Sequence, residues 1–214
     1  MTIVAQNVVP ASVLLQEGQP DWLRRWGSFA EEIRFADLPA PVVERTRLVL
    51  LDCIGAIAAG MQEPEMRNLV ARLAQREAGG GGVPVPVIGA GRRMNPLLAS
   101  LLNGTAGTML ELDEGNQYAR GHPGIHVVPA ALAAGERLAV SGSDLLLAIA
   151  LGYEIGSRIG IASKLRVTMH PHGTWGTVGA ALAAARLEGA TADQVVETIN
   201  IASSFGLSTS RRTM

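Results

Sequence analysis

The four histidines of this 214-residue chain are confined to two short segments. His122 and His126 lie in Gly121-His-Pro-Gly-Ile-His, and His170 and His172 lie in His170-Pro-His-Gly. Imidazole titrates near neutral pH, so it can accept and donate protons in catalysis. Loops held by a rigid scaffold are also where catalytic residues concentrate. The pattern predicts an acid–base site if the two segments meet in space. Loop histidines that only cap helices are the alternative interpretation.

Polar side chains near these segments could orient an imidazole or bind an anionic substrate. A carboxylate beside an imidazole fixes the ring tautomer and raises its basicity. A guanidinium can clamp a substrate carboxylate, and the N–H groups at a helix start can hold one. The candidates are Glu111, Asp113, Glu114, Asn116, Gln117 and Arg120 before His122, and Thr174 after His172. A solvated loop is the alternative interpretation of the acidic run.

A metal site is a more specific alternative for the histidines, and the sequence does not favour it. His122 and His126 are four residues apart, but Pro123-Gly124 between them disfavours a helix that would align the two rings. The sequence has no H-E-x-x-H motif, and its single cysteine, Cys53, lies in an apolar run that predicts a core position. We therefore expect no metal and no other cofactor.

The apolar periodicity, caps and breakers predict an all-α fold with one short extended segment at 83–88. Hydrophobic residues make up 48% of the chain and aromatic ones 4%, which suits closely packed helices with small residues at their contacts. We expect an N-terminal arm over 1–20, a helical domain over 21–214, and a long polar loop over 111–126. Helices are predicted over 22–34, 42–59, 64–77, 97–110, 129–139, from the Ser143-Asp144 cap to 162, 175–187 and 191–205. The first has Trp22, Trp26, Phe29 and Ile33 on one face. Asn95-Pro96 is typical of a cap and first helical residue, and Thr191-Ala-Asp-Gln of a capping box.

Charge and hydropathy exclude several classes of partner. The chain has 18 Lys+Arg against 19 Asp+Glu and no basic stripe, so we expect no nucleic-acid binding. Residues 1–10 contain no Lys or Arg and no long apolar run, which argues against a secretory signal. No charge-free apolar stretch reaches the roughly 20 residues that a membrane span needs. We expect a cytoplasmic protein without a membrane partner.

Several segments, in order along most of the chain, resemble the MmgE/PrpD family. They are Leu48–Gly60, Val87–Gly91, Asn103–Glu114, His122–Glu136, Gly152–Arg158 and His170–Leu187. Each is weak alone, but together they are specific. The resemblance implies metal-free acid–base chemistry at a carbon next to a carboxylate, shared by 2-methylcitrate dehydratase, cis-aconitate decarboxylase and iminodisuccinate epimerase. It also implies a large all-α domain built from both ends of the chain, a smaller α+β lid, and a homodimer.

Carried onto this sequence, the resemblance assigns catalysis to His122 and His170, with Asp113 orienting His122. The chain has Leu-Glu-Leu-Asp-Glu where the family has an LDFDD-like stretch, and one residue more before His122. Glu111, Asp113 and Glu114 therefore remain alternative matches. His126 stands where many relatives have Thr. The substrate-binding positions implied are Glu111, Asn116, Gln117, Arg120, His126, His172 and Thr174.

The leading hypothesis is a cofactor-independent lyase of the 2-methylcitrate dehydratase type that acts on a small polycarboxylate. An epimerase or a decarboxylase of the same family is the first alternative, and a non-catalytic helical subunit of a split enzyme is the second. The family is about twice as long as this chain, which ends before the region where the lid would follow. We therefore expect the lid to be absent, and either a homodimer or association with a polypeptide that corresponds to the C-terminal half.

Overall fold

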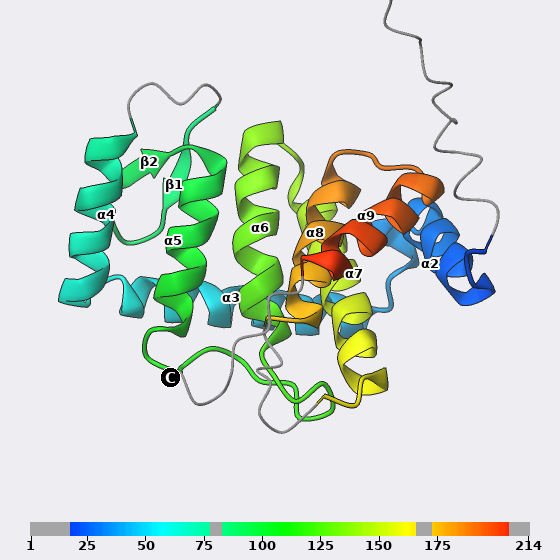
Figure 1. Ribbon diagram of the computed structural model, residues 1–214. Helices are drawn as coiled ribbons and strands as arrows, with labels where there is room; N and C mark the ends of the chain where they lie inside the picture. Colours follow the sequence, from blue (N-terminus) through cyan, green and yellow to red (C-terminus); the bar gives the residue numbers. More distant parts are fainter. Residues whose placement is uncertain (1–17, 78–82, 166–172, 206–214) are drawn as a thin grey trace, which may run out of the picture.

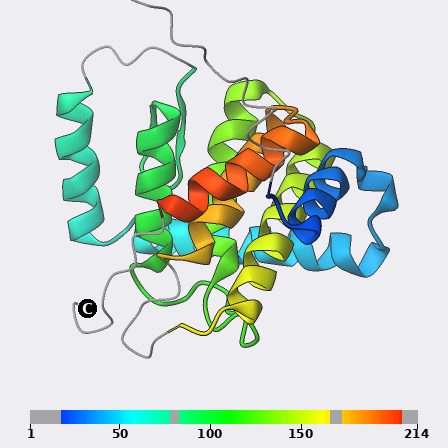
Figure 2. The same cartoon turned by 45° about the vertical axis from the view of Figure 1, so that its right-hand side comes forward.

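The computed structural model describes residues 18–77, 83–165 and 173–205, and most of them are helical (Figure 1). The elements are α2 (Asp21–Glu32), the 3-10 helix η1 (Phe35–Asp37), α3 (Ala40–Gly60), α4 (Pro64–Arg76), β1 (Val85–Val87), β2 (Arg92–Met94), α5 (Pro96–Thr108), α6 (Pro123–Leu138), α7 (Gly142–Ala162), α8 (Trp175–Leu187) and α9 (Ala192–Ser204). Helices α4, α5 and α6 stand side by side, α3 runs across their lower ends, and α2 packs against α9 (Figures 1 and 2). The predicted all-α fold with one short extended segment is confirmed.

Local capping explains where several helices begin. Asn95 precedes α5, and its Oδ1 accepts from the Leu98 amide at 3.0 Å, while Pro96 occupies the first turn. Thr191 and Gln194 form the predicted capping box of α9. Helix α7 begins slightly earlier than predicted, because Ser141 rather than the Ser143-Asp144 pair is its N-cap.

Small residues allow the helices to approach closely. One cluster of buried residues joins α3, α4, α5, α6 and the hairpin to parts of α7 and α8, and a second joins α2, α7, α8 and α9. The most extensive contact among the described elements is between α7 and α8. A Cβ atom placed on Gly152 of α7 would lie only 2.5 Å from the carbonyl oxygen of Gly179 in α8. Cys53 is fully buried, which confirms its predicted core position.

The buried face of α2 differs from the predicted one. The amphipathic pattern indicated a face of Trp22, Trp26, Phe29 and Ile33. The structure instead buries Leu23, Gly27 and Ala30. Helix α9 comes so close that a Cβ on Gly27 would lie 2.6 Å from the Ala192 carbonyl oxygen, so only small residues fit this contact. The Trp22 ring, left about half exposed, packs edge-on against Trp26.

The extended segment forms one strand of a two-stranded hairpin. Val85 pairs with Met94 and Val87 with Arg92 in antiparallel register. The second strand was not predicted, since three residues are too short to show an alternating pattern. Buried Asn103 of α5 anchors the hairpin: its Oδ1 accepts from the Ile88 amide at 2.9 Å, and its Nδ2 donates to the Pro86 carbonyl at 3.1 Å.

Helix α7 is long and apolar enough to cross a membrane by length and composition alone, and no other helix in the described ranges is. Half of its apolar window is buried inside the protein. Core helices meet the same criterion, and α7 packs on both α8 and α6.

Candidate active site

The connection from α5 to α6, residues 109–122, carries most of the predicted site and folds back on itself. The Asn116 amide donates to the Gly121 carbonyl at 2.8 Å, and the Gly121 amide donates to the Asn116 carbonyl at 3.3 Å. Asn116 Oδ1 also accepts from the backbone amides of Tyr118 and Ala119. Glu111 and Arg120 adopt left-handed backbone conformations, with φ of 52° and 58°. Such conformations are costly for non-glycine residues and concentrate at functional sites.

His122 ends this loop and is the N-cap residue of α6. The prediction that the loop extends to residue 126 was wrong, because α6 begins at Pro123. Proline suits the first helical position, where its missing N–H is not needed and its φ is already helical. Pro123 therefore starts the helix, and His126 lies one turn inside it.

The His122 imidazole is held against Asp113. Its Nδ1 lies 3.2 Å from the Asp113 backbone carbonyl oxygen and 3.1 Å from the carboxylate Oδ2. The carbonyl contact has hydrogen-bond geometry, whereas Oδ2 has no well-aligned hydrogen bond and contributes as a nearby charge. With the carboxylate ionised, both oxygens can only accept, which assigns the proton of the neutral ring to Nδ1. The neutral ring then presents its lone pair on Nε2, which makes Nε2 the basic atom.

Asp113 is buried, with its side chain only 2% exposed. Burial raises the pKa of this carboxyl, because desolvation disfavours the charged form. The neighbouring His122 opposes that effect, and Glu111 adds a small further rise. Asp113, the carboxylate that the family resemblance pairs with His122, thus lies against that ring in the structure.

Glu114 joins the loop to two helices. Its Oε1 accepts from the Gly124 amide in the first turn of α6, and its Oε2 accepts from the Tyr153 hydroxyl of α7 at 3.0 Å. Burial raises the pKa of Glu114, and these two hydrogen bonds lower it in part. The sequence indicated Glu114 only as a general candidate and an alternative match to Asp113, and it did not indicate Tyr153. The available signal was a phenol on the apolar helix α7, which needs a polar partner when it is buried.

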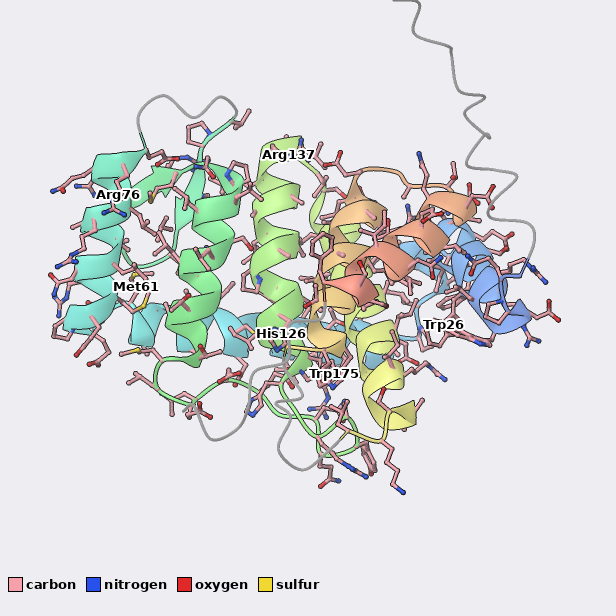
Figure 3. All side chains as sticks on the ribbon, viewed as in Figure 1. Trp26, Met61, Arg76, His126, Arg137 and Trp175 are labelled. Atoms are coloured by element: carbon pink, nitrogen blue, oxygen red, sulfur yellow. The ribbon has the colours of Figure 1, made fainter. Side chains whose placement is uncertain are left out.

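His126, in the first turn of α6, lies against the start of α8. Its ring packs edge-on against Trp175, with centroids 6.1 Å apart, and Figure 3 shows both at the lower ends of α6 and α8. A Cβ on Gly176 would lie 2.6 Å from the His126 ring, so α8 begins directly against it. The helix start that follows the second histidine segment thus lies against the first segment. His170 and His172 themselves are outside the described residues.

The other predicted site residues that the structure describes have fewer contacts with the His122–Asp113 pair. Glu111, Gln117 and Arg120 have exposed side chains on the loop. Thr174 is the half-buried N-cap residue of α8. Asn116 Nδ2 lies 3.5 Å from the Tyr153 hydroxyl, at the outer limit of a hydrogen bond.

A pocket of about 650 Å³ opens beside the loop, between α2 and the end of α7. Trp22, Trp26, Asn116, Tyr118 and Tyr153 are among the residues that line it. His122 and Asp113 do not line it, so this pocket is adjacent to the acid–base pair and separate from it. Among the described residues, no group of three or more His, Cys, Asp or Glu side chains is placed to hold a metal ion.

Comparison with known proteins gives consistent matches over most of the chain. A family model described as the MmgE/PrpD N-terminal domain matches residues 24–213. The chain is 32% identical over 183 residues to cis-aconitate decarboxylase of Aspergillus terreus, which covers 81% of this chain and 37% of that protein. It is 31% identical over 186 residues to cis-aconitate decarboxylase-like protein oryM of Aspergillus oryzae, covering 82% and 38% respectively. The chain thus spans less than two fifths of the length of these curated relatives.

Proposed function

The chain belongs to the MmgE/PrpD family, and from this premise we propose that it carries the acid–base centre of a lyase for small polycarboxylates. The observation that supports this most is the His122–Asp113 pair, in which two oxygens face Nδ1. A general base is effective when a neighbouring group fixes its tautomer and orientation. Asp113 provides both for His122.

In the proposed chemistry, Nε2 of His122 exchanges a proton with the carbon next to a substrate carboxylate. For a dehydration, neutral His122 removes that proton, and the departing hydroxyl takes a proton from a second acid. We propose His170 for that second role, as the family resemblance implies. For a decarboxylation, the C–C bond to the leaving carboxylate breaks, CO₂ departs, and a protonated imidazole gives a proton to the carbon that keeps the electron pair.

We favour decarboxylation of cis-aconitate or a similar tricarboxylate over the dehydration of 2-methylcitrate. Two curated relatives are a cis-aconitate decarboxylase and a protein described as cis-aconitate decarboxylase-like. Dehydration and epimerisation remain the alternatives that the family resemblance supports, because all three reactions need the same proton transfer.

Substrate binding is proposed at the edges of the acid–base pair. Arg120, two residues before His122, offers an exposed guanidinium for a carboxylate. Thr174 and the first turn of α8 offer a hydroxyl and backbone N–H groups. We propose that His172, Asn116, Gln117 and Glu111 contribute further contacts.

We further propose that this chain works together with the part of the protein that its relatives have in addition. Helix α5 and the following loop expose several leucines, with Leu97 84%, Leu101 56% and Leu112 61% exposed. On α3, Leu51 is 67% exposed. An interface with a second polypeptide would bury such side chains. The partner that we propose for these leucines is a polypeptide that corresponds to the C-terminal part of the relatives, and a homodimer is the alternative. Sedimentation of the two chains, each alone and then mixed, distinguishes the two cases.

The function is tested by expressing this chain together with such a C-terminal polypeptide and supplying candidate acids. Release of CO₂ from cis-aconitate supports the decarboxylase, and formation of a new alkene from 2-methylcitrate supports the dehydratase. Loss of optical rotation, with deuterium from solvent at the inverted carbon, supports the epimerase. Absence of all three reactions and of deuterium exchange, from a complex shown to be folded, contradicts the proposal.

A further inference from the structure

The Glu114 side chain uses both of its carboxylate oxygens to join three parts of the site. Glu114 is the loop residue next to Asp113. Its carboxylate accepts one hydrogen bond from the Gly124 amide, two residues after His122, and another from the Tyr153 hydroxyl on α7. The bond between Glu114 and the Gly124 amide therefore joins the chain next to Asp113 to the chain two residues after His122. Tyr153 then ties both to α7, whose contact with α8 is the most extensive between two elements in the described part of the protein.

We propose that Glu114 and Tyr153 are positioning residues that hold His122 in the orientation its proton transfer needs. This inference rests on the proposed role of His122 as the acid–base group. Neither residue is expected to touch substrate, and both act through His122 and Asp113.

The packing around Gly124 shows that this arrangement is tightly fixed. A Cβ on Gly124 would lie 2.6 Å from Glu114 Oε1, 2.8 Å from Val49 Cγ1 and 2.9 Å from Cys53 Sγ. The Gly124 amide is one of the first N–H groups of α6, which no helical carbonyl can satisfy. Glu114 satisfies it, so the start of α6 has a single preferred position against α3.

The two hydrogen bonds to Glu114 join it to two different helices. The bond to Gly124 fixes the loop to α6, whereas the bond from Tyr153 fixes Glu114 to α7 at 3.0 Å. Without the Tyr153 hydroxyl, the Glu114 carboxylate loses the partner that holds its position, and its bond to the Gly124 amide loosens with it. The loop and the start of α6 could then shift relative to each other, and the His122 ring would lose its fixed relation to the Asp113 carbonyl oxygen, only 3.2 Å away.

A merely structural hydrogen bond would affect stability but leave the imidazole tautomer unchanged, which gives a direct test. The 214-residue chain is labelled with ¹⁵N-histidine, and two-bond ¹⁵N–¹H spectra are recorded at a pH where the ring is neutral. The His122 signals are assigned by their loss in His122→Gln. The variants are Tyr153→Phe and the isosteric Glu114→Gln, with Tyr118→Phe as control. Tyr118 lies on the same loop and is 72% exposed.

The wild-type chain and Tyr118→Phe are expected to show His122 with its proton on Nδ1. Tyr153→Phe and Glu114→Gln are expected to show a mixture of the two tautomers, with folding retained by circular dichroism. If Tyr153→Phe does not fold, Glu114→Gln decides alone. A wild-type tautomer pattern in a folded variant overturns the positioning role. A wild-type ring protonated on Nε2 instead contradicts the proposed base, so the two failures are distinguishable.

The complete enzyme gives a second readout. Tyr153→Phe is expected to lower kcat about 10- to 100-fold with KM nearly unchanged, the range expected when a catalytic group is slightly misplaced. A kcat equal to that of Tyr118→Phe overturns the proposal.

Discussion

The close approach of α7 and α8 makes a quantitative prediction for two glycine-to-alanine substitutions that are chemically identical. Gly152 lies inside α7 and Gly55 inside α3, so each substitution gains about 1 kcal/mol of helix propensity. A Cβ on Gly55 meets nothing within 4 Å. Gly55→Ala is therefore expected to stabilise the protein by about 1 kcal/mol.

Gly152→Ala is expected to have the opposite effect. The new Cβ would lie 2.5 Å from the Gly179 carbonyl oxygen, 2.9 Å from Val127 Cγ1 and 3.0 Å from Ala183 Cβ. Overpacking costs about 1–3 kcal/mol, and the upper end applies because the first obstacle is backbone. After the gain in propensity, the net loss is about 2 kcal/mol, which leaves the two variants about 3 kcal/mol apart.

Thermal unfolding followed by circular dichroism measures this difference. For a protein of this size, 1 kcal/mol changes Tm by about 2–4 °C, so the variants are expected to differ by about 6–12 °C. The reasoning is refuted if Gly152→Ala melts at or above the temperature of Gly55→Ala, since α7 and α8 would then not be in the contact described.

Three further predictions concern the loop and the hairpin. Arg120→Gly is expected to stabilise the protein by about 1 kcal/mol, because glycine adopts the left-handed backbone at φ 58° without strain. The same substitution removes the proposed carboxylate contact, so the KM for the substrate is expected to rise; an unchanged Tm together with an unchanged KM contradicts this. Asn103→Ala leaves the Ile88 amide without its partner and is expected to cost about 1–3 kcal/mol in urea unfolding; a cost near zero contradicts the anchor. Burial raises the pKa of Asp113 and Glu114 above their unfolded values, so the stability from these groups is fully present at low pH and is lost as pH rises through the folded pKa values. The double variant Asp113→Asn/Glu114→Gln should therefore lose this slope in the free energy of unfolding; an unchanged slope contradicts it.

Local signals in the sequence predicted most of the helices, because caps and breakers act within a few residues. Asn95-Pro96 marked the start of α5, and Thr191 with Gln194 marked the start of α9. The same local reasoning failed at Pro123, where the residue that disfavours helix inside an element instead begins one. It also failed for α2, whose buried face depends on how close α9 comes.

The candidate site was predicted in part, and distance along the chain explains the rest. Asp113 and His122 are nine residues apart, so composition and the family resemblance were sufficient to pair them. Tyr153 is 39 residues from Glu114, and nothing in a single sequence indicates which phenol reaches which carboxylate. The packing of His126 on Trp175, which places the start of α8 against α6, was hidden for the same reason.

The most direct test concerns proton transfer by His122 in the complete enzyme. Turnover of cis-aconitate in deuterium oxide is followed by mass spectrometry for wild type and His122→Gln, with folding checked by circular dichroism. The wild type is predicted to place deuterium on the reacting carbon, and His122→Gln to be at least about 100-fold slower, the smallest usual contribution of a positioned acid or base. A folded His122→Gln enzyme that incorporates deuterium at the wild-type rate would show that this imidazole does not move the proton.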